Sequence, residues 1–163
     1  MFDVFGFYKF IKISYLKKNQ KILRNHLLNK NIRGTVIISK EGLNGTISGK
    51  NKDIKLIKDY LHKLFKFEKF DSINNSKSSF QPFHKPKVKI KKEVVPMNLS
   101  LKKRIKKKDS HVNPQKWNSL IKDKKTVLID ARKPFEYKVG TFKGSINPDV
   151  DNFRDFPRYL KKL

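Results

Sequence analysis

Hydrophobic and polar positions in the first part of the chain follow the two periods of regular secondary structure. Residues 3–11 are rich in aromatic and β-branched side chains and predict a strand. Apolar residues recur at helical spacing over residues 14–31, where Ser14 is expected to cap the helix, and again over residues 52–65. The two periodic segments therefore predict two helices, each with an apolar stripe.

The segments between and after these helices predict the remaining strands. Residues 35–39 form a continuous apolar run, which is typical of a central strand. The glycine-containing residues 40–45 predict a turn, and residues 46–50 a short third strand. After a polar stretch at residues 71–79, alternation over residues 85–95 predicts a fourth strand, with apolar side chains on one side and lysines on the other.

The expected order of elements divides the chain into two domains. The order βαββαβ is that of a ferredoxin-like split βαβ unit, so we expect an α+β domain at residues 1–95. Residues 96–112 open at a proline and carry a dense basic run, which is either a solvated connector or a strap that contacts phosphates. Residues 113–163 hold too few elements to close a domain and predict an incomplete α/β domain.

Within this second domain the signals are local. Asn113 is expected to cap a helix that has Pro114 at its first position. Residues 126–131 are expected to form a buried strand and residues 134–140 a short helical turn, and residues 152–163 begin another helix.

Composition adds an extreme charge and an absence of thiols. The formal net charge is +26, most of it from lysine, and the chain has no cysteine. The charge favours a polyanionic partner such as nucleic acid, although the abundance of Lys, Asn and Ile with a single Ala also fits an AT-rich genome. No apolar run reaches the roughly 18 residues of a membrane span, and without disulfides a cytoplasmic location is expected.

The alternating basic strand is the first candidate site. Exposed lysines with Phe80, Phe83 and His84 nearby could hold single-stranded RNA, because cations bind phosphates and rings stack on bases. An edge strand that lysines protect from aggregation is the other interpretation. The candidate RNA-binding residues are Lys85, Lys87, Lys89, Lys91 and Lys92.

The glycine-rich segment 41–49 is the second candidate. It is either a tight turn or a place where the backbone approaches a phosphate or a base closely. An acceptor and an amide in this segment could read base edges or ribose hydroxyls. The possible substrate-facing residues are Glu41, Gly42, Asn44 and Gly45.

The segment 128–148 is the third candidate. Asp130 and Arg132 follow a predicted strand at its carboxyl end, where open α/β sheets place functional groups. With Glu136 they could equally form an ion network that supports the loop.

No residue near this segment supplies a nucleophile. Thr141 and Ser145 have no histidine close in sequence, the four histidines follow no triad or metal-ligand spacing, and there is no phosphate-binding P-loop motif. We therefore expect no metal.

Taken in order, these stretches resemble one family. "KEGLNGTISG", "KPKVKIKKEVV", "NPQKWNSLIKD" and "LIDARKPFEYKVGTFKGSINPDVDNFRDFP" are similar to the rhodanese-like tRNA uridine hydroxylases, from about residue 3 to the last residue. Residues 130–144 also match the general rhodanese pattern of Asp-x-Arg, then Glu, then Gly-x-(aromatic or Ile)-x-Gly.

The resemblance implies a fold and an activity. It implies a ferredoxin-like domain followed by a rhodanese-like α/β domain, and the oxygen-dependent hydroxylation of the tRNA wobble uridine to 5-hydroxyuridine, with molecular oxygen as co-substrate and no other cofactor. The family's catalytic cysteine lies in a Cys-x-x-Gly-x-Arg loop that would follow the helix at residues 152–163, so the rhodanese-like domain is expected to be truncated before it. Asp130, Arg132 and Glu136 carry over as loop-supporting residues only.

Two alternatives to an oxygen-dependent tRNA hydroxylase remain open. The chain could be a tRNA-binding module without chemistry, or part of a rhodanese-type sulfurtransferase, which needs the same cysteine. In every case we expect the chain by itself to be inactive as an enzyme.

Overall fold

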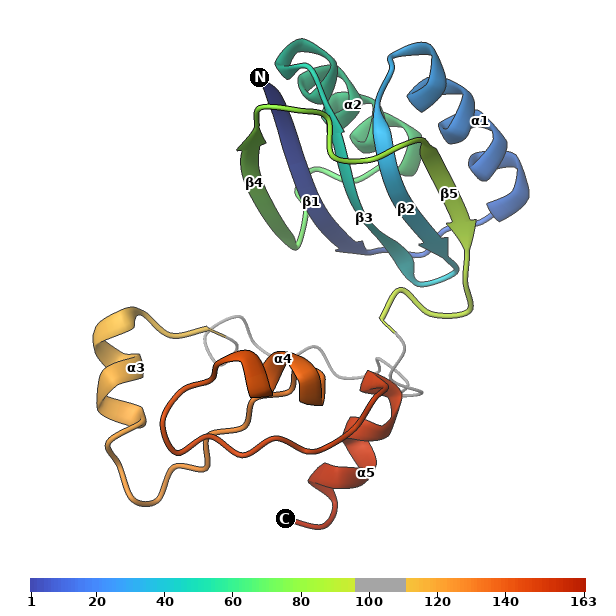
Figure 1. Cartoon of the computed structure of the whole chain (residues 1–163). Coiled ribbons are helices and arrows are strands. Elements are labelled where there is room, and N and C mark those ends of the chain that lie inside the picture. Colours follow the sequence, from blue (N-terminus) through green and yellow to red (C-terminus); the bar gives the residue numbers. More distant parts are fainter. Residues whose placement is uncertain (96–110) are drawn as a thin grey trace. The chain divides into compact units, whose positions relative to one another are not determined.

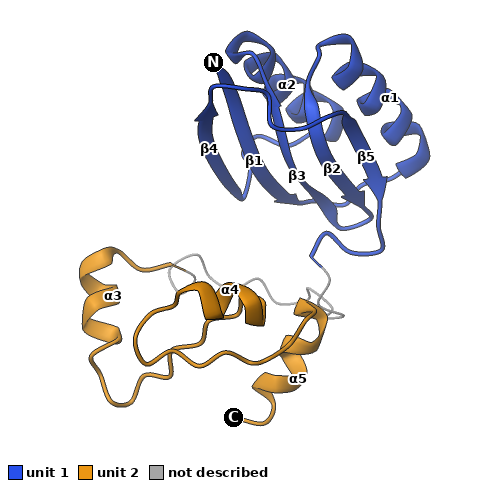
Figure 2. Ribbon diagram, viewed as in Figure 1, with its two compact units in different colours: residues 1–95 blue, residues 96–163 orange. Residues whose placement is uncertain are grey.

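The computed structural model describes residues 1–95 and 111–163 of the chain. It divides into two compact units, Met1–Val95 (unit 1) and Pro96–Leu163 (unit 2) (Figure 2). Most of the expected basic linker at 96–112 lies outside the described residues. Among the described residues, no helix is both long enough and apolar enough to cross a membrane.

Unit 1 is a mixed α/β fold in which two helices cover one face of a five-stranded sheet (Figure 1). The strand order is β4-β1-β3-β2-β5, with β5 parallel to β2 and the other neighbours antiparallel. Its elements are β1 (Phe2–Phe10), α1 (Leu16–Asn29), β2 (Arg33–Ser39), β3 (Gly42–Gly49), α2 (Asn51–Phe65), β4 (Ser72–Ser78) and β5 (Pro86–Ile90).

The core of unit 1 lies between the sheet and the two helices. Alternate residues of each central strand are buried, as the period-2 pattern requires, and both helices turn one apolar stripe toward them. Phe5 and Phe7 on β1 stack with ring centroids 4.9 Å apart, and Phe70 packs against both. The fully buried apolar side chains are Phe5, Leu23, Leu27, Ile32, Val36, Ile38, Leu43, Ile47, Ile57 and Leu61.

The expected order of four strands is wrong, because the sheet contains a fifth strand. The polar stretch at 71–79 contains β4, which pairs with β1 from Phe2↔Ser78 to Tyr8↔Ser72 although nearly all its side chains are exposed. The basic strand is therefore the fifth and lies at the opposite edge, beside β2. An edge strand is held by backbone hydrogen bonds to a single neighbour, so its side chains need not alternate between apolar and polar.

Two local expectations are also corrected. Ser14 does not cap α1: the cap position is Tyr15, at φ 52°, and no side chain accepts a cap hydrogen bond there. The expected turn at 40–45 is shorter, because β3 begins at Gly42 and pairs with both β1 and β2 along its length. Residues 42–45 are thus part of a central strand.

Unit 2 consists of short elements: α3 (Pro114–Leu120), α4 (Pro134–Val139), the 3₁₀ helix η2 (Phe153–Asp155) and α5 (Phe156–Leu160). The expected cap is confirmed, since the Asn113 Oδ1 accepts a 2.8 Å hydrogen bond from the Lys116 amide and Pro114 opens α3. The helices expected near residues 134–140 and 152–163 are confirmed as well.

The buried strand expected at 126–131 is wrong. Only a single parallel bridge, Ile129↔Ile146, forms there, and Val127 is 59% exposed. Among residues 111–163 only Ser145 and Pro148 are buried. A strand needs neighbouring strands and a covered face to become regular, and the described part of unit 2 provides neither.

The contrast between the units predicts their hydrogen exchange. In the monomeric chain, amides of β1 and β3 should be strongly protected because they lie inside a cooperative sheet. Amides of residues 126–130 should exchange far faster, because among the described residues only one β-bridge holds this segment and no packed layer covers it. Uniformly strong protection across 126–130, measured by mass spectrometry or NMR, would contradict this picture.

Candidate functional site

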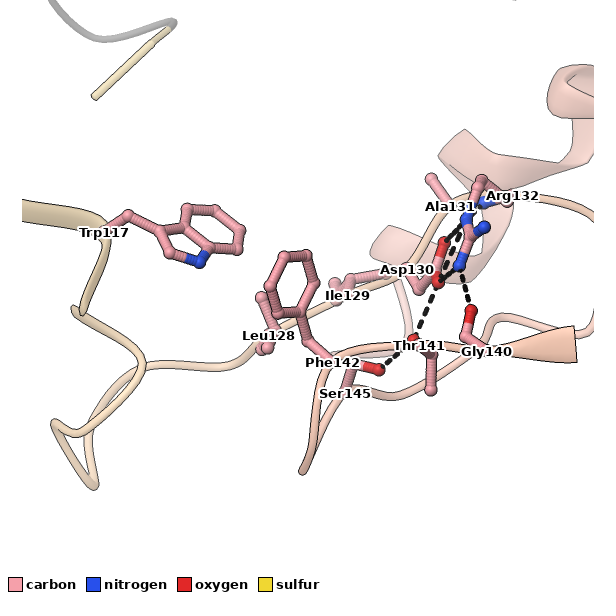
Figure 3. Close-up of a pocket in the computed structure, with 10 residues that line it drawn as sticks. All are labelled: Trp117, Leu128, Ile129, Asp130, Ala131, Arg132, Gly140, Thr141, Phe142 and Ser145. Atoms are coloured by element: carbon pink, nitrogen blue, oxygen red, sulfur yellow. Dashed lines mark hydrogen bonds and ion pairs between the residues drawn. The ribbon is translucent and has the colours of Figure 1, made fainter. Parts of the chain in front are cut away.

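An ion pair between Asp130 and Arg132 lies at the start of the loop that follows Ile129. The Arg132 guanidinium donates to both carboxylate oxygens of Asp130, the shortest contact being 2.6 Å, and also to the Gly140 carbonyl at 2.6 Å (Figure 3). The Asp130 side chain is only 11% exposed, whereas that of Arg132 is 49% exposed. A bidentate pair of this kind fixes the orientation of both partners. The hydrogen bond from Arg132 to the Gly140 carbonyl ties residue 132 to residue 140 across α4.

A chain of hydroxyl groups extends from the same carboxylate. The Thr141 hydroxyl donates to Asp130 Oδ2 at 2.8 Å and lies 2.6 Å from the Ser145 hydroxyl. The Asn147 amide donates to the carbonyls of Asp130 and Arg132, each at 2.9 Å. The sequence analysis rejected Thr141 and Ser145 as nucleophiles and did not consider Asn147. The available signal for this hydrogen-bond network was a set of polar residues close to Gly140 and Gly144.

Glu136 contributes to the loop at the start of α4. It is not part of the Asp130–Arg132 hydrogen-bond set, because its carboxylate accepts a 3.1 Å hydrogen bond from the Lys133 amide at the start of α4. This is half of a capping box, which satisfies a free amide of the first turn. Glu136 therefore supports the loop by fixing α4, and acts on Arg132 only electrostatically, helping to raise its pKa.

The electrostatic environment of Asp130 fits a structural role in the loop better than a role in proton transfer. Hydrogen bonds from Arg132, and secondly from Thr141, hold the pKa of the Asp130 carboxyl well below its usual range. A carboxylate that is so weakly basic is a poor general base. The Thr141 and Ser145 hydroxyls consequently have no partner among these residues that could activate them as nucleophiles.

An open cavity of about 450 Å³ lies beside this cluster. One wall is polar, formed by Asp130, Arg132 and Thr141, and the opposite wall is aromatic, where the rings of Trp117 and Phe142 lie 5.3 Å apart (Figure 3). The indole nitrogen of Trp117 is buried and has no hydrogen-bond partner among the described residues. No side chain that lines the cavity is a thiol or an imidazole.

The structure separates the candidate residues of segment 41–49. The Glu41 carboxylate accepts a 2.7 Å hydrogen bond from the Val94 amide, which ties the β2–β3 turn to the end of unit 1. Gly45 faces the helices, where an added Cβ would lie 2.9 Å from both the Phe7 ring and the Thr35 carbonyl oxygen. Gly42 is buried as well, leaving Asn44 as the member that lies half-exposed on the sheet face opposite the helices.

The basic strand is placed largely as its alternation suggested. Val88 is buried, while Lys87 and Lys89 are exposed on the other side of β5. Lys85 and Lys91 flank the strand, are exposed and keep the same alternation, whereas Lys92 has the opposite parity. Of the neighbouring rings, Phe80 is 67% exposed and Phe83 is half-buried.

The histidines are dispersed over the described residues. His26 stacks on Tyr60 with centroids 3.7 Å apart, and His62 Nδ1 lies 2.9 Å from the Phe67 carbonyl oxygen. His84 and His111 are exposed on different units. Among residues 1–95 and 111–163, no group of three His, Cys, Asp or Glu side chains is arranged to hold a metal ion.

Comparison with known proteins identifies the family of unit 1. A family profile described as "UPF0176 acylphosphatase like domain" matches residues 2–94. The chain belongs to this family. The match spans the whole sheet and both helices of unit 1.

Relatives of the UPF0176 chain extend the similarity through unit 2. A Pelagibacter ubique protein named "tRNA uridine(34) hydroxylase" is 64% identical over 163 residues, which is 100% of this chain and 54% of that protein. A Bartonella quintana protein of the same name is 36% identical over 161 residues, covering 99% of this chain and 53% of its own. The chain therefore spans about half the length of the curated relatives it matches.

Among solved structures, an acylphosphatase from Bacillus subtilis aligns with 54% of the UPF0176 chain and 98% of its own, at 10% identity and a TM-score of 0.40. Nothing about function follows from a likeness at this level.

The packing around Gly45 predicts a stability effect. Gly45→Ala should destabilise unit 1 by about 1–3 kcal/mol, because the new methyl group overpacks a rigid core. Gly6→Ala is the matched control on β1, where the nearest atom to an added Cβ is 3.5 Å away, so its effect should stay within about 0.5 kcal/mol. Urea unfolding followed by circular dichroism measures both. Equal midpoints for the two variants would argue that Gly45 is not a packing residue.

The Asp130–Arg132 pair predicts a pH dependence. Because the folded-state pKa of Asp130 is depressed, the pair stabilises the loop above the ordinary aspartate pKa of about 3.9, and this contribution is lost as the pH falls through the folded-state value. Arg132→Gln should raise the Asp130 titration midpoint, measured by NMR of the carboxyl carbon, while Arg154→Gln in η2 should leave it unchanged. The same midpoint in both variants would contradict the assignment.

Proposed function

We propose that this chain provides the tRNA-binding unit and the beginning of a rhodanese-like unit of an enzyme that hydroxylates the tRNA wobble uridine to 5-hydroxyuridine, with molecular oxygen as co-substrate. The observation that carries the proposal is the 64% identity, along the whole chain, to a protein named for that reaction.

The geometry of unit 2 favours a structural role for its loop in this reaction. The bidentate pair of Asp130 and Arg132 and the cap made by Glu136 give a loop whose shape is held by hydrogen bonds instead of a core. A loop of this kind can position a neighbouring catalytic segment. The chain itself has no cysteine, so these 163 residues do not supply the thiol implied by the resemblance.

The charge distribution of unit 1 supports tRNA as the partner. Lys87 and Lys89 line one edge of the sheet on the side away from the helices, Lys85 and Lys91 are exposed at the two ends of that strand, and the chain carries a net charge of +26. Clustered cations bind nucleic acid by displacing counterions from its phosphates. The same observation favours the second candidate, a tRNA-binding module without chemistry.

A chimera tests the enzymatic part. Residues 1–163 of this chain would replace the matching part of the Pelagibacter ubique relative, and the chimera, the unaltered relative and the chain alone would each be incubated with unmodified tRNA and oxygen. Mass spectrometry of the tRNA nucleosides should detect 5-hydroxyuridine with the relative and the chimera. The chain alone should form none, because it has no thiol.

The outcomes separate the candidates. An inactive chimera beside an active relative would refute the enzymatic proposal, and if that chimera and the chain still bound tRNA in a salt-sensitive way, the non-catalytic module would be favoured. Formation of 5-hydroxyuridine by the chain alone would refute the role given to the missing thiol.

A further inference from the structure

One face of the sheet in unit 1 carries no helix. The helices α1 and α2 cover the other face (Figure 1), and side chains at alternate strand positions, such as Phe5, Val36, Ile47 and Val88, are buried there. The intervening positions lie on the opposite side, which we call the open face. Its residues include Val4, Gly6, Tyr8, Phe10, Arg33, Thr35, Ile37, Asn44, Thr46, Ser48, Asn74, Ser76, Lys87 and Lys89.

Strand register aligns aromatic and basic side chains across the open face. Tyr8 pairs with Asn44, Asn44 with Ile37, and Ile37 with Lys89. At roughly 4.8 Å between neighbouring strands, this row is about 14 Å long. The next row runs from Gly6 to Lys87 in the same way.

The rings at one end of these rows lie together. The centroids of Tyr8 and Phe10 are 5.7 Å apart and the two rings are edge to face. Both side chains are half-buried. Phe10 lies on one side of Tyr8 along β1, and on the other side Gly6 has no side chain, so no β1 side chain covers the Tyr8 ring on the Gly6 side.

The open face is electrostatically one-sided. Asp3 is the one acidic residue in the five strands, and it lies on the helix side, where its carboxylate accepts a 2.6 Å hydrogen bond from Asn51. The carboxylate of Asp71, just before β4, is bound to the Lys9 ammonium and the Phe10 amide, each at 2.8 Å. The open-face strand positions therefore combine Arg33, Lys87 and Lys89 with neutral side chains alone.

The part of the open face around these rows is uncovered within unit 1. The connection from β4 to β5 crosses the sheet near the end where β1 begins (Figure 1). Gln81 anchors that connection by donating to the carbonyls of Asn31 and Ser48, at 2.8 and 3.1 Å. Ser48 lies opposite Val4, two rows away from Tyr8, so the crossing segment is held away from the row that ends in Lys89.

We propose that the open face between Tyr8 and Lys89 binds an unpaired loop of RNA, with bases stacked on Tyr8 and Phe10 and phosphates held by Lys87 and Lys89. Stacking of splayed bases on rings exposed on a sheet is how single-stranded RNA is recognised by open-faced α/β folds, and lysines along one edge follow the backbone. Asn44 and Thr46, between the rings and the lysines, offer hydrogen-bonding groups to the bases. This inference rests on the proposed function and adds to it the surface and the unpaired state of the RNA.

Protection of an edge strand against aggregation explains Lys87 and Lys89 alone. It does not explain the rings of Tyr8 and Phe10, which both lie on β1, three strands away from that edge. The experiment therefore has to examine the lysines and the rings separately.

The lysines are tested by salt dependence. The double variant Lys87→Gln/Lys89→Gln is compared with Lys52→Gln/Lys55→Gln on the exposed side of α2, which removes the same charge. The probes are an RNA hairpin with an unpaired loop and a blunt RNA duplex with the same number of phosphates. For the hairpin, the slope of log affinity against log salt should fall in magnitude by about 1.4 in the first variant, since each phosphate contact contributes about 0.7. The α2 variant should keep the wild-type slope.

The rings are tested at one position. Tyr8→Phe keeps the aromatic face and should bind the hairpin as the wild type does, whereas Tyr8→Leu should weaken hairpin binding at least about fivefold through lost stacking. Neither change should alter duplex binding. Circular dichroism of both variants establishes that the sheet is intact.

Three outcomes would overturn the inference. They are equal hairpin affinity for Tyr8→Phe and Tyr8→Leu, equal salt slopes for the two lysine variants, or equal loss of hairpin and duplex binding. Each of these would leave the proposed tRNA-binding function standing provided that the wild-type chain binds tRNA with salt-sensitive affinity. If the wild type binds neither RNA, the tRNA-binding part of the proposed function fails together with this inference.

Discussion

The alternation of side chains along β1, β3 and β2 is the constraint on which unit 1 depends. Burying Phe5, Ile47 and Val36 on one side commits these three strands to a register, because a slip of one residue would turn these side chains to solvent. The same register places Tyr8, Asn44 and Lys89 in one row on the other side. The candidate RNA surface is therefore a consequence of how the core is packed.

Glycine at position 45 belongs to the same constraint. It allows β3 to lie against Phe7 and the β2 backbone more closely than any side chain would permit. This explains how a segment with the composition of a turn can be the middle of a central strand. The carboxylate of Glu41, bonded to the Val94 amide, then ties the preceding turn to the end of the unit.

Unit 2 follows a different physical logic. With only Ser145 and Pro148 buried among residues 111–163, its local shape depends on polar contacts between near neighbours in sequence. Asp130 gathers Arg132 and Thr141, and Asn147 joins the two sides of the loop through backbone carbonyls. Such a network can fix a loop without a core, but it leaves apolar side chains such as Val127, Phe135 and Val139 at the surface.

The sequence by itself determined what depends on neighbours along the chain. The helical stripes of α1 and α2, the Asn113 cap and the alternation around Val88 all follow from local spacing, and so does the pairing of Asp130 with Arg132 two residues later. Only the tertiary structure decided that a polar stretch is β4, that Gly45 lies under Phe7, and that Tyr8 and Lys89 share one row. These features depend on backbone pairing between strands far apart in sequence. Every residue type except proline offers the same backbone N–H and C=O groups, so this pairing cannot be identified from the residue types alone.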